Sequence, residues 1–187
     1  MRKAFILGLV AFGTSMVVAY GDIIPTLSSV TGSSPNFTWS YSANVTVDET
    51  VNHNDFFTIY DFSAIMPTVT TQPTGWTFST ALVGPTPGLV TPTDNASLWN
   101  LTWTYTGTTP LSGAQALGFF TAVTNTDQLK TGQFSAEATR SGDPTNTKID
   151  NVGQVSVPVP ESTSMLPLLG ICGLAIAFGS RLRRQHA

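Results

Sequence analysis

The sequence predicts an all-β protein: a single antiparallel β-sandwich of about seven strands. Short runs of β-branched and aromatic residues alternate with threonine, serine and asparagine, which is the period of a half-buried strand. Glycine and proline separate these runs at fairly regular intervals. Between the two ends of the chain no stretch shows the apolar repeat of an amphipathic helix. Two packed antiparallel sheets are therefore favoured over a mixed α and β architecture.

The strands are expected in seven places along the chain. Phe37 to Val47 and Trp99 to Tyr105 alternate most clearly between apolar and polar residues. Asp55 to Ser63 is more continuously apolar, which predicts a central strand. Gly84 to Asp94 contains three prolines and predicts a long surface loop. The remaining strands are expected near residues 76–78, 119–123, 134–138 and 149–157, with Phe119 and Val123 among the apolar series.

Residues 1–19 have the pattern of a secretory signal peptide. A basic pair precedes an apolar run, and Val17 and Ala19 have the small side chains expected before a cleavage site. The mature chain is therefore expected to begin near Tyr20 and to lie outside the cytoplasmic membrane.

The segment 20–156, which we expect to be the exported domain, is acidic. Its only basic residues are Lys130, Arg140 and Lys148, whereas ten of the eleven Asp and Glu residues of the chain lie in it. Binding to a phosphate backbone requires clustered Lys and Arg, so the composition argues against a nucleic-acid partner.

The C-terminal end predicts a membrane-spanning helix over about residues 164–180. Met165 to Phe178 (MLPLLGICGLAIAF) is continuously apolar and would cover roughly 21 Å as a helix, against a hydrocarbon core of about 30 Å. The basic tail 181–187 contains Arg181, Arg183 and Arg184. Such a cluster is expected to remain cytoplasmic and to stop export of the chain.

Three classes of anchoring signal could account for the C-terminal segment. A GPI signal ends in its hydrophobic tail, whereas this chain continues into a basic cluster. A sortase signal of the Leu-Pro-x-Thr-Gly kind is approximated by residues 166–170, but Leu169 replaces the threonine and the string lies within the apolar run. The third class combines a Pro-Glu motif, a short apolar helix and a terminal arginine cluster.

Residues 157–187 resemble this third class, the PEP-CTERM sorting signal of exported bacterial proteins. The motif lies in 157–163, where Val159, Pro160 and Glu161 match and Ser162 stands at the place of the second proline. An alternative alignment on 157–160 keeps both prolines and replaces the glutamate with valine. The resemblance implies processing by an exosortase, a membrane-embedded cysteine protease or transpeptidase, and a final place at the cell surface or outside the cell.

Residue types needed for catalysis are sparse, and we expect no enzyme activity. His53 is the only histidine of the exported segment, and no Gly-x-Ser-x-Gly string accompanies it. Asp48 and Glu49 are adjacent, so on a strand they would point to opposite faces. Asp55 and Asp61 would lie roughly 20 Å apart along one strand. Neither pair suits acid–base catalysis of glycoside hydrolysis.

No cofactor is expected either. The single cysteine, Cys172, lies in the C-terminal apolar run, so the exported segment contains neither a disulfide nor a thiolate metal site. The oxygen-rich stretch 143–151 could donate ligands to calcium, although Lys148 lies within it.

These observations predict a non-enzymatic protein of the cell envelope or extracellular matrix, whose partners are the membrane and a processing enzyme. The alternative is a carbohydrate-binding module of the exopolysaccharide matrix, because tryptophan rings can stack on sugars. Trp39, Trp99 and Trp103 are assigned to the core in preference. Trp76, beside Thr74-Gly75, is the best candidate for an exposed stacking platform.

Overall fold

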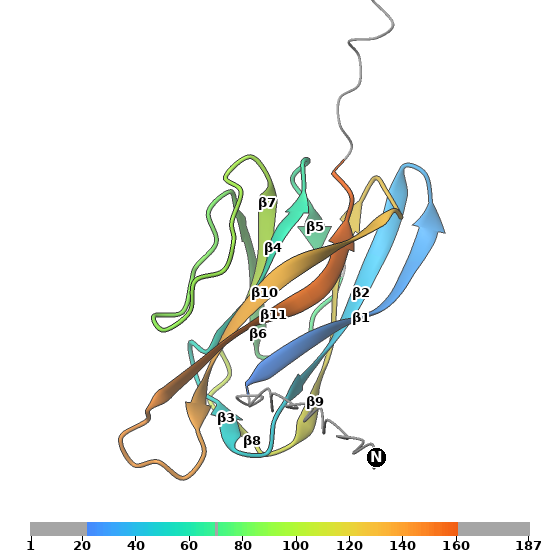
Figure 1. Ribbon diagram of the computed structural model, residues 1–187. Coiled ribbons are helices and arrows are strands. Elements are labelled where there is room, and N and C mark those ends of the chain that lie inside the picture. Colours follow the sequence, from blue (N-terminus) through green and yellow to red (C-terminus); the bar gives the residue numbers. More distant parts are fainter. Residues whose placement is uncertain (1–21, 70, 161–187) are drawn as a thin grey trace, which may run out of the picture.

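The computed structural model describes residues 22–69 and 71–160, and this part of the chain is all-β. It contains eleven strands and no helix, and every strand pair in it is antiparallel (Figure 1). Within these residues no helix is long and apolar enough to cross a membrane. The predicted signal peptide and the predicted helix 164–180 lie outside the described residues.

The strands form two sheets that enclose the core. Sheet A has the order β1-β2-β9-β5 and consists of β1 (Ile23–Ser33), β2 (Asn36–Val45), β9 (Gln115–Thr124) and β5 (Thr68–Val69). In sheet B the order β6-β7-β4-β10 is followed by β3 and β8, and β11 pairs with β10. Its strands are β6 (Trp76–Ala81), β7 (Trp99–Tyr105), β4 (Phe56–Ser63), β10 (Leu129–Arg140), β3 (Glu49–Val51), β8 (Leu111–Ser112) and β11 (Lys148–Pro158).

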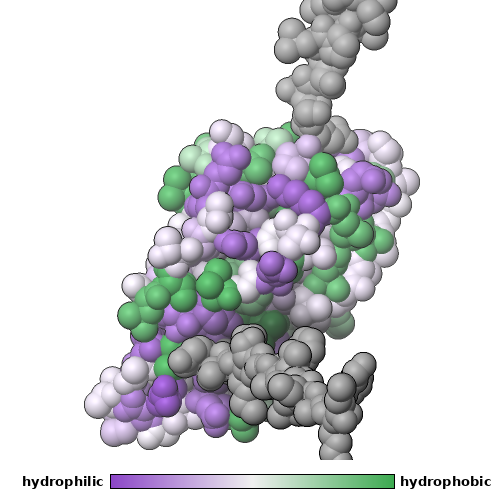
Figure 2. All heavy atoms as spheres, in the orientation of Figure 1, coloured by the Kyte–Doolittle hydropathy of each residue, from purple (hydrophilic) through white to green (hydrophobic). Residues whose placement is uncertain are grey.

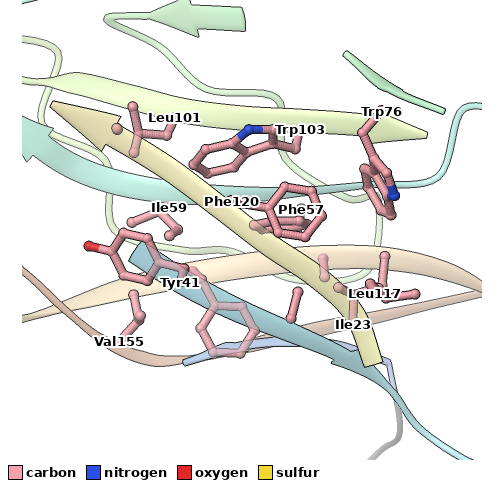
Figure 3. Close-up of a cluster of buried hydrophobic side chains, with 14 of the residues drawn as sticks. Ile23, Tyr41, Phe57, Ile59, Trp76, Leu101, Trp103, Leu117, Phe120 and Val155 are labelled. Carbon is pink, nitrogen blue, oxygen red and sulfur yellow. The ribbon is translucent and has the colours of Figure 1, made fainter. Parts of the chain in front are cut away.

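Aromatic side chains from both sheets fill the space between them. Phe57 of β4 stacks on Trp103 of β7 with ring centroids 5.2 Å apart, and Phe120 of β9 meets Phe57 edge-on at 5.0 Å. Figure 3 shows these rings gathered between the strands of the two sheets. Each such pair contributes about 0.5–1.5 kcal/mol beyond the burial of its area. The protein is therefore held by its core, as expected for a domain without a disulfide.

All seven predicted strands are present, and the alternating patterns explain why they were recognisable. Four further strands were not predicted. β1 is polar and contains Pro25 and a register shift between Leu27 and Ser29, features typical of an edge strand. The other three, β3, β5 and β8, have only two or three residues each.

The face assigned to β9 was wrong. Phe119 is 60% exposed, whereas Leu117 and Phe120 point into the core. The cause is a bulge: Ala43 pairs with Gly118 and Asn44 with Ala116, so Leu117 is an extra residue and the alternation changes phase. Gly118 has φ of +110°, a conformation that glycine adopts without steric cost.

Candidate functional site

The Pro-rich segment 82–98, here called the strap, joins β6 to β7 and crosses the outer face of sheet B (Figure 1). The Pro85 carbonyl accepts a hydrogen bond from the Tyr60 hydroxyl of β4 at 2.7 Å. The Leu89 amide donates to the Asp150 carboxylate of β11 at 2.7 Å, and the Thr93 amide to the Gln133 side chain of β10 at 2.6 Å. The predicted surface loop is thus fixed to three strands of the sheet.

Beneath the strap lies a row of buried hydroxyl groups. The Thr58 and Thr102 hydroxyls are 3.0 Å apart, and the Tyr60 and Ser135 hydroxyls are 2.8 Å apart. These four side chains point away from the aromatic core, yet all are buried. Burial under the strap raises the pKa of Tyr60 above its ordinary value. The strap therefore excludes water from these hydroxyl groups, which would otherwise be exposed to solvent.

Two aspartates fasten the returning half of the strap. Asp61 has φ of +54° at an irregularity in the β4 register, and its carboxylate accepts a hydrogen bond from the Asn95 amide at 2.8 Å. The Asp94 carboxylate accepts from the Gly84 amide at 2.9 Å and from the Asn100 side chain at 3.0 Å. Asp94 thus links the two ends of the strap to each other and to β7.

Replacing Gly84 with alanine should loosen the strap. The added Cβ would lie 2.9 Å from Thr58 Cγ2 and 3.0 Å from Tyr60 Cε1, well inside the normal carbon–carbon separation of about 3.5–4.0 Å. We expect a loss of about 1–3 kcal/mol in the free energy of unfolding, and faster amide hydrogen exchange along the strap.

Gly88→Ala is the matched control, because its Cβ would meet no atom within 4 Å. Both substitutions reduce the freedom of the unfolded chain equally, so the difference between them isolates the steric effect at Gly84. Equal stabilities and equal exchange rates in the two variants would show that the strap is not held at this point.

A polar cleft opens beside the strap on the same face of sheet B. Gln133 and Gln154 are cross-strand neighbours on β10 and β11, and Lys130 lies nearby on β10. Asp61, Thr93, Thr131 and Gly132 also line the cleft. The cleft offers hydrogen-bond donors and acceptors of neutral and charged kinds, and no aromatic side chain lines it.

The prediction that Trp76 is exposed is wrong. Its side chain is only 4% exposed and packs against Phe57, Tyr105 and Phe120, with ring centroids 5.1–5.9 Å apart. Sequence reasoning placed Trp76 at the surface because Thr74-Gly75 precedes it. In the structure that turn directs the ring between the sheets, where it is unavailable for stacking on a sugar.

The other tryptophans lie where the sequence placed them or close to it. Trp39 and Trp103 are fully buried, and Trp39 Nε1 donates a hydrogen bond to the Thr126 carbonyl at 3.0 Å. Trp99, at the start of β7, is half-buried. Among the described residues, no tryptophan is fully exposed.

The structure describes residues 157–160, the first four of the predicted motif segment 157–163. β11 continues through Pro158, so the sheet includes the first two residues assigned to the tail. The Val159 amide then donates a hydrogen bond to the Gln128 carbonyl at 2.8 Å. A small cavity at this junction is lined by Ser63, Ala64, Ile65, Asn125, Thr126, Val159 and Pro160. Glu161, Ser162, Arg181, Arg183 and Arg184 lie outside the described residues.

The carboxylates considered for catalysis are engaged separately. Asp55 is buried and ion-paired with Lys148, whereas Asp61 fastens the strap near the other end of β4. Glu49 is buried and accepts a hydrogen bond from Thr46, while Asp48 is exposed. His53 is exposed.

Within the stretch 143–151, the Asp143 carboxylate is engaged by its own turn. Asp143 accepts hydrogen bonds from the Thr145 hydroxyl at 2.6 Å and the Thr145 amide at 2.8 Å, and also from the Thr147 amide. Hydrogen bonds from Thr145 and Thr147 lower the pKa of Asp143. In the part of the chain that the structure describes, no group of three or more His, Cys, Asp or Glu residues could hold a metal ion.

No model of a known protein family matches the chain, and no curated protein matches it either.

Proposed function

We propose that this chain is an exported, non-enzymatic protein of the cell envelope or extracellular matrix, held in the membrane and sorted through residues 157–187. The observation that supports this most is the position of the motif relative to the fold. The last strand of the β-domain ends at Pro158, within the motif segment 157–163, and Val159 and Pro160 follow at once, so domain and tail are directly continuous. The apolar run begins at Met165, close after the motif.

The two prolines at the start of the motif suit a processing enzyme because they favour an extended backbone. Pro158 and Pro160 disfavour the helical conformation in the residues before them and cannot donate to a helix. The Val159 amide is already bonded to Gln128, which holds the strip against the end of the domain. An exosortase-type enzyme in the membrane would bind the residues that follow.

Fractionation of cells with and without the exosortase tests this proposal. We expect full-length protein to accumulate in membranes when the enzyme is absent, and a shorter product at the cell surface or in the medium when it is present. Protein that is equally soluble and equally unprocessed in both strains would contradict the sorting function.

The arginine cluster provides a sharper test. Changing Arg181, Arg183 and Arg184 together to serine should release unprocessed protein to the outside, because each charge costs about 2.5–3.5 kcal/mol at the bilayer centre and together they oppose passage. Glu161→Ala should leave the protein in the membrane but uncut. Arg140→Ser, on the exposed end of β10, is the control and should behave as wild type. Normal anchoring and processing of the triple variant would show that the apolar run suffices.

The alternative proposal is a carbohydrate-binding module, and the structure changes where its site would lie. With Trp76 in the core, the polar cleft beside the strap is the better candidate, because amide, carboxylate and ammonium groups converge there from separate strands. Polysaccharide pull-down with Gln154→Ala tests it, since this side chain does not fasten the strap. Unchanged or absent binding would remove the cleft as a glycan site.

A further inference from the structure

Large apolar side chains are exposed around the point where β11 ends. Ile65, Met66, Leu129 and Val159 are 49%, 60%, 57% and 38% exposed, and we call this set the apolar end. Ile65 and Val159 line the same small cavity, and Leu129 pairs with Pro158 at the last rung of the β10–β11 ladder. Figure 1 places the β4–β5 connection and the end of β11 at the same end of the sandwich, and Figure 2 shows hydrophobic atoms on it.

The opposite end of the sandwich carries a polar turn. The β10–β11 turn there is made of Ser141 to Thr147, which are polar except for one glycine and one proline. Asp143 is bonded within that turn, and Arg140 is exposed beside it. Val47 is also exposed near this turn, at 67%, and the carbonyl of the adjacent Asp48 accepts a hydrogen bond from the Ser141 amide. The apolar end differs in that several large apolar side chains lie together on it.

The chain length beyond the domain restricts how far the apolar end can lie from a membrane. Only residues 161–164 separate Pro160 from Met165, the first residue of the apolar run. A fully extended chain spans at most about 3.6 Å per residue, so these five steps reach no more than roughly 18 Å. The polar headgroup layer itself occupies about 5–8 Å of that distance on each side of the hydrocarbon core.

We propose that the apolar end rests on the outer lipid surface while the tail is anchored, with Ile65, Met66 and Leu129 in the headgroup region. This inference rests on the proposed membrane anchoring. The Val159–Gln128 hydrogen bond fixes the exit of the chain at this end, next to Leu129 and Ile65, so the short connection keeps these side chains close to the bilayer. Burying apolar area in the interface stabilises the contact, and exposed Asp127 and partly exposed Lys130 supply one charge of each sign beside it.

The contact can be measured on the full chain reconstituted in vesicles of phosphatidylcholine with one-quarter phosphatidylglycerol. In a Cys172→Ser background, Met66→Cys is labelled with an environment-sensitive fluorophore. We expect blue-shifted emission and strong quenching by lipids that bear a quencher at the headgroup. Asn146→Cys, in the turn at the opposite end, is the matched control and should remain unquenched.

The outcomes separate the two proposals. Protein that sediments with the vesicles while its Met66→Cys label stays as unquenched as the control would overturn the lipid contact and leave the anchoring intact. Protein that does not sediment with the vesicles would overturn the anchoring and the contact together. Shielding of the label only when a processing enzyme is present would assign the apolar end to a protein partner and overturn the lipid contact.

Discussion

Replacing Asp55 with alanine is expected to lower the free energy of unfolding by about 2–4 kcal/mol, because the Asn52 amide, the Thr139 hydroxyl and the partly exposed Lys148 ammonium lose the acceptor that they share. Asp55 is fully buried, and its carboxylate is ion-paired with Lys148. The same carboxylate accepts hydrogen bonds from the Asn52 amide at 2.7 Å and the Thr139 hydroxyl at 3.1 Å. Since domains are stable by only about 5–15 kcal/mol, this loss should be evident in a urea titration.

Two further variants separate the role of the Asp55 charge from the general effect of removing an acidic side chain. Asp55→Asn retains an oxygen for the Asn52 amide and the Thr139 hydroxyl but removes the charge opposite Lys148, so we expect an intermediate loss. Asp48→Ala changes an exposed acid and should alter stability by no more than about 0.5 kcal/mol. If Asp55→Ala and Asp48→Ala were equally stable, the ion pair would contribute nothing to the fold.

All four tryptophans lie within the described β-domain, so their fluorescence reports its unfolding even in detergent-solubilised full-length protein. Trp39 and Trp103 are fully buried and Trp76 nearly so. Their emission should therefore shift to the red as the core opens. Tryptophan emission therefore follows every urea titration of the β-domain.

The alternation of apolar and polar residues along the chain predicted the all-β fold class, because each long strand buries one face. In β7, Leu101 and Trp103 face the core, and neighbouring residues of opposite parity face the other way. The same pattern was misleading where the backbone departs from regular pleating. The bulge at Leu117–Gly118 turned Phe119 outwards, and nothing in the alternation of β9 alone reveals an extra residue.

The candidate sites depended on contacts between distant segments, which a single sequence does not reveal. Trp76 was placed at the surface from its neighbouring turn, but its environment is decided by Phe120 of the opposite sheet. The polar cleft joins Asp61, Thr93 and Gln154, which come together only because β4, β10 and β11 are neighbours. Proline content predicted that the strap is a loop, but the composition does not show that it is fastened across a sheet.

The second large effect concerns Asp22, which is fully buried immediately before β1. One carboxylate oxygen accepts a hydrogen bond from the Ile23 amide at 2.6 Å, and the other has no hydrogen-bond partner among the described residues. Burial is the main reason that the pKa of Asp22 rises from 3.8 to about 8. The Ile23 hydrogen bond lowers this pKa, and the nearby carboxylates of Glu49, Asp150 and Asp55 raise it. Asp22 is therefore protonated in the folded protein at neutral pH.

The raised pKa of Asp22 makes the folded protein less stable as the pH rises. In the unfolded chain Asp22 ionises near pH 4, whereas in the folded protein it keeps its proton up to about pH 8. Between these values unfolding releases a proton, so stability falls as pH rises, by up to about 1.4 kcal/mol per pH unit. Below pH 4 and above pH 8 this contribution no longer changes with pH.

Asp22→Asn should therefore remove the loss of stability between pH 5 and pH 8 and make the protein more stable at pH 8 by several kcal/mol. Asparagine keeps an oxygen for the Ile23 amide and replaces the unpaired oxygen with an amide group that never ionises. Urea titrations at each pH measure the effect, and Asp127→Asn, an exposed acid, is the control and should follow the wild type. Because substitution of a buried acid ordinarily destabilises a protein, a gain confined to high pH would identify the raised pKa as its cause. Parallel curves for Asp22→Asn and wild type from pH 5 to pH 8 would show that Asp22 ionises alike in the folded and unfolded states.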